Sequence, residues 1–310
     1  MFKTPVVFIC YNRPLVTKKT FSQIRKLKPK KLFLIMDGPK MKNNNDLINC
    51  QKVKKIISQI NWDCDVYKNF SKINLGLKKR VVSGLNWVFS KVDRAIILED
   101  DCYAGQNFFY FCETLLNYYK SNKKVSVITG NNFEENIINS SSYYFSKYSH
   151  IWGWATWKRT WKLYSDNNVS IRRFIKSEAF KKSCPINDEQ KYWIKMFEQI
   201  KKGYQESWAY YFLLNIWKHN GLTVTPNYNL VENLGINNEL STHKIDKHLR
   251  ISLTKKKLKK QLIHPKNIFI NSDIDKLVFY KIYYKNLHFR LKSKLKKIIN
   301  WFKLEYNFVL

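Results

Sequence analysis

The sequence has no long apolar run. Nowhere do about 18 or more uncharged apolar residues follow one another, which is the length that a membrane-spanning helix needs. The first segment, MFKTPVVFICYNRP, also lacks the extended apolar core and the small-residue cleavage site of a secretory signal. We therefore expect a cytoplasmic protein.

Cysteine is sparse, and its spacing is irregular. The six cysteines form no Cys-x-x-Cys pair and mostly lie inside apolar stretches; they are Cys10, Cys50, Cys64, Cys102, Cys112 and Cys184. Such spacing fits neither a structural zinc site nor a disulfide framework. We expect reduced cysteines in the core.

Acidic residues are few compared with basic ones. The chain has 23 Asp and Glu against 56 Lys and Arg, which gives a formal net charge of +33. This charge favours polyanions such as nucleic acid, an anionic membrane or phosphorylated substrates, although a biased base composition of the gene also accounts for many lysines. The basic residues form no RNP-like sheet, helix-turn-helix or zinc module, so we expect no nucleic-acid partner.

Strand-like and helix-like segments alternate through the first half of the chain. The strand-like segments are PVVFICYN, KKLFLIMDGP, CDVYKNF, RAIILEDD and VSVITGNNF. Helical segments with one apolar face lie between them, and the first begins at Pro14, a residue suited to a first helical turn. The pattern predicts an α/β fold with a mostly parallel sheet that helices cover on both faces.

Polar residues follow three of the predicted strands where each strand ends. Asn12 and Arg13 follow the first strand, Asp37 the second, and Glu99–Asp101 the fourth. Ligands of parallel sheets bind at the carboxyl ends of the strands, so neighbouring strands would bring these side chains together. Arginine suits phosphate, and carboxylates suit a base, a ribose or a phosphate-bound metal. The pattern predicts a nucleotide site.

The carboxylates of Glu99, Asp100 and Asp101 form an acidic triplet directly after a buried strand. Clustered negative charge at such a place is costly unless a cation is bound. Alternation along a strand would place Glu99 and Asp101 on one face and Asp100 on the other. Mg²⁺ or Mn²⁺ is commonly held by one or two carboxylates together with diphosphate oxygens. We expect a divalent cation here; a solvated acidic loop is the alternative.

Seven segments in this order carry a resemblance to a known family: PVVFICYNRP, LFLIMDGP, NLGLKKRVVSGLNWVF, AIILEDDC, FFYFCETLLNYY, ITGNNF and IWGWATWKRTW. Together they resemble bacterial nucleotide-diphospho-sugar glycosyltransferases of the GT-A fold, and are similar to glycosyltransferase family 2 and to the family 13 N-acetylglucosaminyltransferases. The resemblance implies a GT-A domain over residues 1–244. Its nucleotide-binding half would be about 1–130 and its acceptor half about 131–244.

The resemblance also implies a set of site residues. The donor-binding residues would be Arg13, Asp37, Arg80, Glu99 and Asp100. The metal ligands would be Asp101, within a DXD-type motif, and His243, although a single histidine in a polar loop is often incidental. Asn229, Asn233 and Gly235 would shape a loop over the donor. The implied reaction is the inverting, Mn²⁺- or Mg²⁺-dependent transfer of a hexosyl or N-acetylhexosaminyl group from a UDP-sugar to a hydroxyl of a surface glycan.

Tryptophans gather in the segment YSHIWGWATWKRTWKLY, around Gly153. Flat aromatic faces complement the C–H faces of sugar rings, whereas tryptophans that fill the space between two halves of the domain are the alternative. Trp154, directly after Gly153, is the first candidate for contact with a sugar, and Trp152 is the second.

An inverting transfer needs a general base near the acceptor hydroxyl, usually Asp or Glu. The candidates are Asp188, Glu189 and Glu206. Glu206 lies near the start of the predicted helix SWAYYFLLNIWKHNG, where the helix dipole favours an anion. The family pattern has Asp at the position that Ala209 occupies here. This departure leaves open a second function, that of a catalytically impaired sugar-nucleotide-binding scaffold.

The composition changes after residue 244. Lysines alternate with Leu, Ile, Trp and Phe at helical spacing, and Trp301 and Phe302 lie near the end. Basic amphipathic helices of this kind are typical of contact with an anionic membrane surface. We interpret residues 245–310 as a helical basic C-terminal extension that holds the protein at the inner face of the cell membrane, near a lipid-linked glycan acceptor. Docking of this extension on the domain is the alternative.

Overall fold

The structure is a computed structural model of the chain, and it describes residues 2–134, 140–203, 207–236, 252–253 and 261–284. The predictions for Glu206, His243, Trp301 and Phe302 lie outside these residues.

The first half of the chain alternates strands and helices as the sequence predicts. Its elements are β1 (Val6–Cys10), α1 (Pro14–Leu27), β2 (Lys31–Met36), α2 (Asn44–Ile57), β3 (Asp65–Phe70), α3 (Leu77–Lys91), β4 (Arg94–Glu99), β5 (Cys102–Ala104), α4 (Gln106–Tyr118) and β6 (Val125–Thr129). Pro14 begins α1, and the side chain of Asn43 caps α2 by accepting from the backbone N–H of Asp46 at 3.0 Å.

The second half is richer in helices. Its elements are β7 (Tyr143–Ser146), β8 (Trp154–Trp157), α5 (Lys158–Trp161), α6 (Asn168–Ile175), α7 (Glu178–Ser183), α8 (Asn187–Lys201), α9 (Trp208–Lys218), β9 (Leu222–Pro226), β10 (Val231–Asn233), α10 (Ser272–Val278) and the π-helical segment η2 (Phe279–Tyr284).

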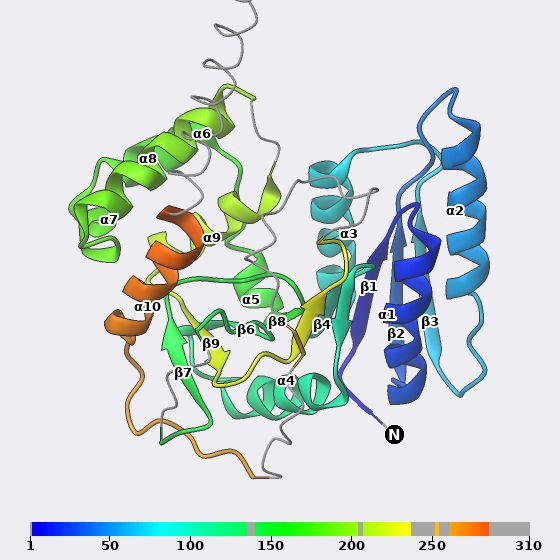
Figure 1. The fold of residues 1–310 in the computed structure, drawn as a ribbon, viewed down its shortest axis with the longest axis horizontal. Coiled ribbons are helices and arrows are strands. Elements are labelled where there is room, and N and C mark those ends of the chain that lie inside the picture. The colour runs from blue at the N-terminus through cyan, green and yellow to red at the C-terminus, as the bar shows by residue number, and fades with distance from the viewer. Residues whose placement is uncertain (1, 135–139, 204–206, 237–251, 254–260, 285–310) are drawn as a thin grey trace, which may run out of the picture.

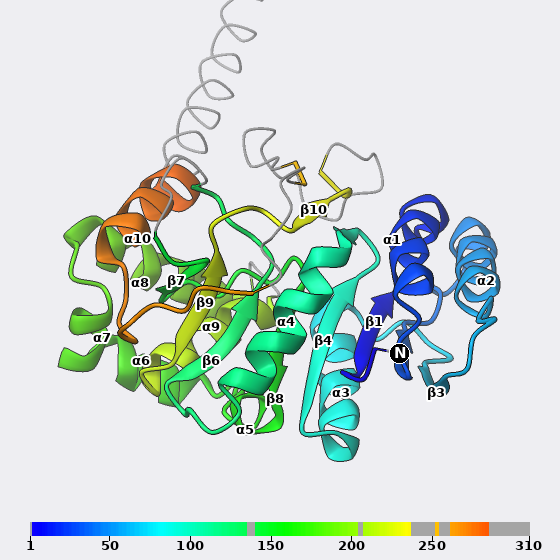
Figure 2. The ribbon, with the colours of Figure 1, turned by 90° about the horizontal axis from the view of Figure 1, so that it is seen from below.

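The central sheet has eight strands in the order β3-β2-β1-β4-β8-β6-β9-β7, and β10 and β5 form a second sheet of two strands. The strands from β3 to β4 are parallel, β8 runs antiparallel to both of its neighbours, and β9 is again parallel to β6. Figure 2 shows α1, α2 and α4 on one side of the sheet and α3 and α5 on the other. The predicted α/β class, with a mostly parallel sheet and helices on both faces, is confirmed.

The core follows the two faces of the sheet. Phe8, Leu34 and Leu98 pack under α1, α2 and α4, whereas Ile35 and Ile97 pack under α3 and α9. Period-two alternation in buried strands explains this division, because successive side chains point to opposite faces. The prediction for the cysteines also holds, since all six are free and all except Cys64 are buried.

Part of the predicted C-terminal extension packs into the domain. Ile274 and Val278 of α10 and Phe279 of η2 are buried in a core cluster with residues of α6, α7, α8 and α9, and α10 lies beside these helices in Figure 1. Ahead of α10, the backbone N–H of Asn271 donates to the carbonyl of Phe145 in β7 at 2.8 Å. For residues 261–284, docking on the domain is therefore the arrangement found.

Among the residues that the structure describes, no helix combines the length and the apolar character needed to cross a bilayer.

Candidate functional site

The carboxyl ends of β2, β1 and β4 lie side by side. Ile9 of β1 pairs with Ile35 of β2 on one side and with Glu99 of β4 on the other. The loops that carry Arg13 and Asp37 and the acidic triplet therefore begin at one edge of the sheet, as expected from the sequence. We call this place the carboxyl edge.

Arg13 binds two carboxylates of the triplet. Its Nη1 donates to Oδ2 of Asp101 at 2.9 Å, and its Nη2 donates to Oδ1 of Asp100. Asp100 also accepts from the backbone N–H of Tyr11 at 3.3 Å. The prediction that Asp100 and Asp101 point to opposite faces is wrong, because β4 ends at Glu99 and the following turn directs both carboxylates to one guanidinium.

The carboxyl edge carries more negative charge than Arg13 balances. Burial, followed by the charges of Asp101 and Asp100, raises the pKa of Glu99 well above its ordinary value. Burial also raises the pKa of Asp100, although the neighbouring guanidinium of Arg13 opposes this. Clustered carboxylates resist ionisation in this way when no further positive charge is near. A bound cation would reduce the electrostatic repulsion among these carboxylates.

The carboxylate oxygens at the carboxyl edge suit a cation that phosphate oxygens also coordinate. Asp101 has a second oxygen, Oδ1, which accepts a weak contact from Cys102 Sγ at 3.5 Å. Within the described ranges, no group of three or more His, Cys, Asp or Glu is arranged as a metal centre. One or two carboxylates with diphosphate oxygens and water are, however, a common environment for Mg²⁺. The residues fit this kind of site and do not form a closed protein cage.

The chain after β10 passes close over the triplet. The backbone N–H of Leu234 donates to the carbonyl of Asp101 at 2.8 Å, and Asn233 Oδ1 accepts from the N–H of Gly235 at 2.8 Å. A Cβ atom on Gly235 would overlap Oδ2 of Asp101 and would lie 3.1 Å from Nη1 of Arg13. A side chain at 235 would therefore require the carboxylate of Asp101 to move.

Asp37 and Arg80 make hydrogen bonds that hold the loops at the carboxyl edge in place. Three backbone N–H groups donate to the buried carboxylate of Asp37, those of Gly38 and Leu75 at 2.9 Å and that of Gly76 at 3.1 Å. Nη2 of Arg80 donates to Oδ1 of Asn69 at 2.7 Å. Burial raises the pKa of Asp37, and the three backbone donors oppose the rise. These contacts join the loop after β2 to the start of α3.

Trp154 and Trp152, the two candidates for sugar contact, differ in burial. Trp154 is fully buried and packs against Trp208 and Phe212, with ring centroids 5.8 and 5.1 Å away. The prediction that Trp154 contacts a sugar is wrong, because its side chain fills the core between the sheet and α9. Trp154 pairs with Ile97 in the antiparallel register, so half-buried Trp152 lies two residues further on, toward Glu99.

Asp188 lies apart from the triplet. It belongs to the first turn of α8, where Tyr280 Oη lies 3.5 Å from its Oδ2. α8 and β4 are well separated in Figures 1 and 2. A carboxylate in the first turn is favourable for the helix dipole, which accounts for its position. The structure does not bring Asp188 together with Arg13 and the triplet.

Sequence reasoning missed several side chains near this edge. Asp46, at the start of α2, accepts from Tyr11 Oη, from Asn12 Nδ2 and from the N–H of Lys40. These hydrogen bonds lower the pKa of Asp46 against the effect of burial and fix the loop after β1. No sequence signal links Asp46 with residues more than 30 positions earlier. Asn131 was also missed; it is fully buried after β6, and its Nδ2 donates to the carbonyl of Val231 at 3.3 Å.

No protein-family model matches the chain, and no curated protein matches its sequence. Similar solved structures include 4-diphosphocytidyl-2C-methyl-D-erythritol synthase from Anaerococcus prevotii DSM 20548, with 12% identity over 57% of this chain and 78% of that chain and a TM-score of 0.32. A cytidylyltransferase from Leptospira borgpetersenii serovar Hardjo-bovis (strain JB197) has 12% identity over 53% and 63%, with a TM-score of 0.33. UDP-glucose pyrophosphorylase complexed with UDP-glucose has 8% identity over 54% and 80%, with a TM-score of 0.30. Likenesses this distant carry no conclusion about activity.

Proposed function

We propose that this protein is a metal-dependent, inverting glycosyltransferase that transfers a sugar from a UDP-sugar to a hydroxyl of a surface glycan. The proposal rests on the ion pairs of Arg13 with Asp100 and Asp101 at the carboxyl ends of β1 and β4. Parallel α/β sheets bind nucleotides at such edges. The resemblance to GT-A glycosyltransferases, which includes the same triplet, supports the reaction class.

The donor diphosphate would lie over the acidic triplet. Asp101 would hold the divalent cation, with Glu99 and Asp100 beside it, and a cation there supplies neutralisation of the departing UDP. Arg13 has guanidinium N–H groups at the same place, and guanidinium binds phosphate oxygens well. The segment at Gly235, which covers Asp101, would keep water away from the bound diphosphate.

The chain departs from the family pattern at the position of the general base. Ala209 stands in the first turn of α9, where the family pattern has Asp. Asp188 lies elsewhere and Glu189 is buried against Lys147. Glu206 is therefore the carboxylate that we propose as the base. Ala209 also favours the second candidate function, a sugar-nucleotide-binding scaffold with impaired catalysis.

Nucleotidyl transfer, the activity indicated by the names of the solved structures above, is less compatible with this sequence. The loop after β1 reads Tyr11-Asn12-Arg13-Pro14 and contains no glycine. A glycine-rich loop lets backbone N–H groups surround a triphosphate. We therefore prefer transfer of the sugar to transfer of the nucleotide.

We also propose that the basic residues of 245–310 that lie outside the docked segment 261–284 hold the protein at the inner face of the cell membrane. Lys and Arg near an anionic leaflet each contribute on the order of 1 kcal/mol to binding. Such a location suits a lipid-linked acceptor of a capsule or lipooligosaccharide.

Release of UDP from a panel of UDP-sugars, with Mn²⁺ and without it, tests the reaction. The proposal predicts slow, Mn²⁺-dependent release by the wild type, with a strong loss in Glu206→Gln. Donor binding without any release, even with glycan acceptors present, would favour the scaffold function.

A further inference from the structure

An aromatic cluster lies in the segments that follow β6 and precede β8. Phe133, which follows β6, contacts the rings of His150 and Trp152, with centroids 4.5 and 5.5 Å away. Both partners precede β8, whose first residue, Trp154, pairs with Ile97. The antiparallel register carries the chain from Trp154 back toward the carboxyl edge. We call Phe133, His150 and Trp152 the aromatic shelf.

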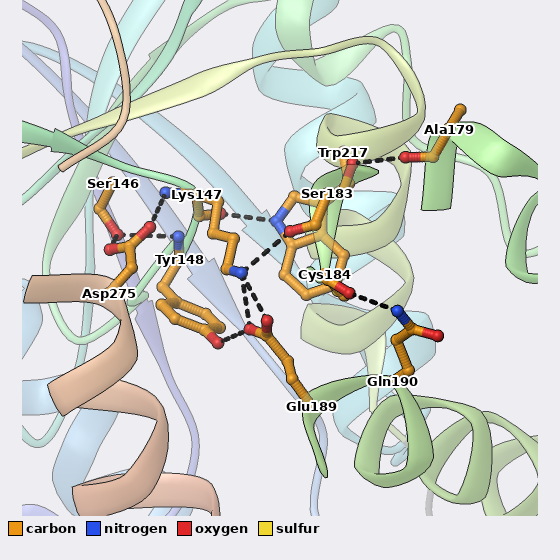
Figure 3. Close-up of polar contacts among 10 residues, drawn as sticks. All are labelled: Ser146, Lys147, Tyr148, Ala179, Ser183, Cys184, Glu189, Gln190, Trp217 and Asp275. Carbon is orange, nitrogen blue, oxygen red and sulfur yellow. Dashed lines mark hydrogen bonds and ion pairs between the residues drawn. The ribbon is translucent and has the colours of Figure 1, made fainter. Parts of the chain in front are cut away.

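The segment that carries the shelf is held rigidly from two sides. Nζ of Lys147 lies 2.7 Å from the buried carboxylate of Glu189, and Tyr148 Oη donates to the same carboxylate (Figure 3). The N–H of Lys147 donates to Asp275 at 2.9 Å. On the other side, Thr129 Oγ1 donates to the carbonyl of His150 at 2.7 Å. These contacts anchor the chain on both sides of residue 149.

The imidazole of His150 is neutral and has no hydrogen-bond partner in the described part of the chain. Burial lowers its pKa to about 3, so the ring is neutral, with one N–H donor and one nitrogen acceptor. Neither ring nitrogen has a hydrogen-bond partner among residues 2–134, 140–203, 207–236, 252–253 and 261–284. The residue as a whole is partly exposed. Half-buried donors and acceptors without protein partners are well placed to bind polar groups of a substrate.

The far end of the shelf is closed by η2. Nζ of Lys281 donates to the carbonyl of Phe133 at 2.6 Å and lies 3.2 Å from Glu134 Oε2. Tyr283 packs on Tyr148, with centroids 5.2 Å apart. The positive charge of Lys281 is thus paired, and the shelf consists of two apolar rings and a neutral imidazole. This combination suits an uncharged sugar better than a phosphate.

We propose that the aromatic shelf is the acceptor subsite, where Trp152 packs on a face of the acceptor sugar and His150 hydrogen-bonds one of its hydroxyls. This inference rests on the proposed function, because the acidic triplet, toward which the register of β8 on β4 directs the chain before Trp154, would hold the donor. It assigns the acceptor side to the segment before β8 and a specificity role to His150.

Two variants and a matched control test the subsite. His150→Phe keeps an aromatic ring against Phe133 and removes hydrogen bonding, and His150→Ala removes both. His219→Ala, at the exposed C-terminal end of α9, is the control. The probes are octyl glycosides of glucose, galactose and N-acetylglucosamine, and saturation-transfer NMR measures their binding to the full chain with UDP and Mn²⁺ present. Calorimetry of UDP-sugar binding is run on the same samples.

The proposal predicts that wild type and His219→Ala give saturation transfer to at least one glycoside. Both His150 variants should lose about tenfold or more in glycoside affinity and keep UDP-sugar affinity within about twofold. An unchanged glycoside signal in both variants, or no glycoside signal from the wild type with donor bound, would overturn the subsite. Failure of the wild type to bind any UDP-sugar contradicts the proposed function instead.

Discussion

The guanidinium of Arg13 lies against the carboxylate of Asp101, with Nη1 2.9 Å from Oδ2, although 88 residues separate them in the chain. The contact exists because β1 and β4 are parallel neighbours whose carboxyl ends coincide. It brings Arg13, a side chain suited to phosphate, into contact with Asp101, a side chain suited to a cation. This pair is the centre of the proposed donor site.

Replacement of Arg13 should cost more stability than replacement of an exposed cation. In Arg13→Met the buried carboxylate of Asp100 loses its counter-charge, and loss of one partner from a buried pair costs about 3 kcal/mol. The matched control is Lys30→Met, which breaks the exposed Lys30–Asp63 pair and should change stability much less. Urea unfolding at pH 7 measures both values. Equal costs would contradict the arrangement.

A methyl group at Gly235 should disturb the donor site. In Gly235→Ala the new Cβ would overlap Oδ2 of Asp101, so we expect UDP-sugar affinity in Mn²⁺ to fall about tenfold or more. Gly105→Ala is the control, because the added Cβ there meets only the flexible end of Leu253, at 3.3 Å. Calorimetry gives both affinities. Wild-type binding by Gly235→Ala would show that the segment does not cover a functional carboxylate.

Asp275 should make stability depend on pH. Burial raises the pKa of this carboxyl from 3.8 to about 7, so between these values the folded protein keeps a proton that the unfolded chain releases. The contribution of Asp275 to stability is therefore greatest below about pH 4 and falls as the pH rises to about 7. Asp275→Asn lacks this dependence. The free energy of unfolding of the variant, relative to wild type, should rise by about 1 to 3 kcal/mol from pH 4 to pH 8.

The control for this pH dependence is Asp273→Asn, an exposed position in the first turn of the same helix. Its difference from wild type should change little over the same range. Thermal unfolding at several pH values in one ionic strength supplies the data. A pH-independent difference between Asp275→Asn and wild type would show that the carboxyl is ionised in the folded protein.

The buried pair between Lys147 and Glu189 should be required for the acceptor half (Figure 3). Glu189→Gln leaves the ammonium of Lys147 without its counter-charge, which costs about 3 to 5 kcal/mol in buried pairs. Glu178→Gln breaks the exposed Lys181–Glu178 pair and should change stability by less than about 0.5 kcal/mol. Urea unfolding distinguishes the two. A small effect of Glu189→Gln would mean that water reaches Lys147.

The sequence predicts much of the nucleotide half because local signals agree there. Apolar runs mark β1, β2 and β4, and Pro14 marks the start of α1. The place of Arg13 beside the triplet also follows, because residues at the ends of neighbouring parallel strands must converge.

Other features depend on contacts that no local pattern contains. The register of β8 against β4 decides to which face of the sheet the Trp154 side chain points. The residue at which β4 ends decides where the carboxylate of Asp100 points. The carboxylate of Asp46 and the pair between Lys147 and Glu189 join segments more than 30 residues apart. Such partners are chosen by the tertiary fold, so composition and periodicity leave them undetermined.

The most direct test of the donor site is calorimetric titration of UDP and UDP-sugars, with and without Mn²⁺, into wild type and Asp101→Asn. Asp63→Asn, an exposed carboxylate paired with Lys30, is the control. The account predicts Mn²⁺-dependent binding by wild type and by Asp63→Asn, and its loss in Asp101→Asn. Binding that does not need Mn²⁺, or that survives in Asp101→Asn, would contradict the assignment of the acidic triplet.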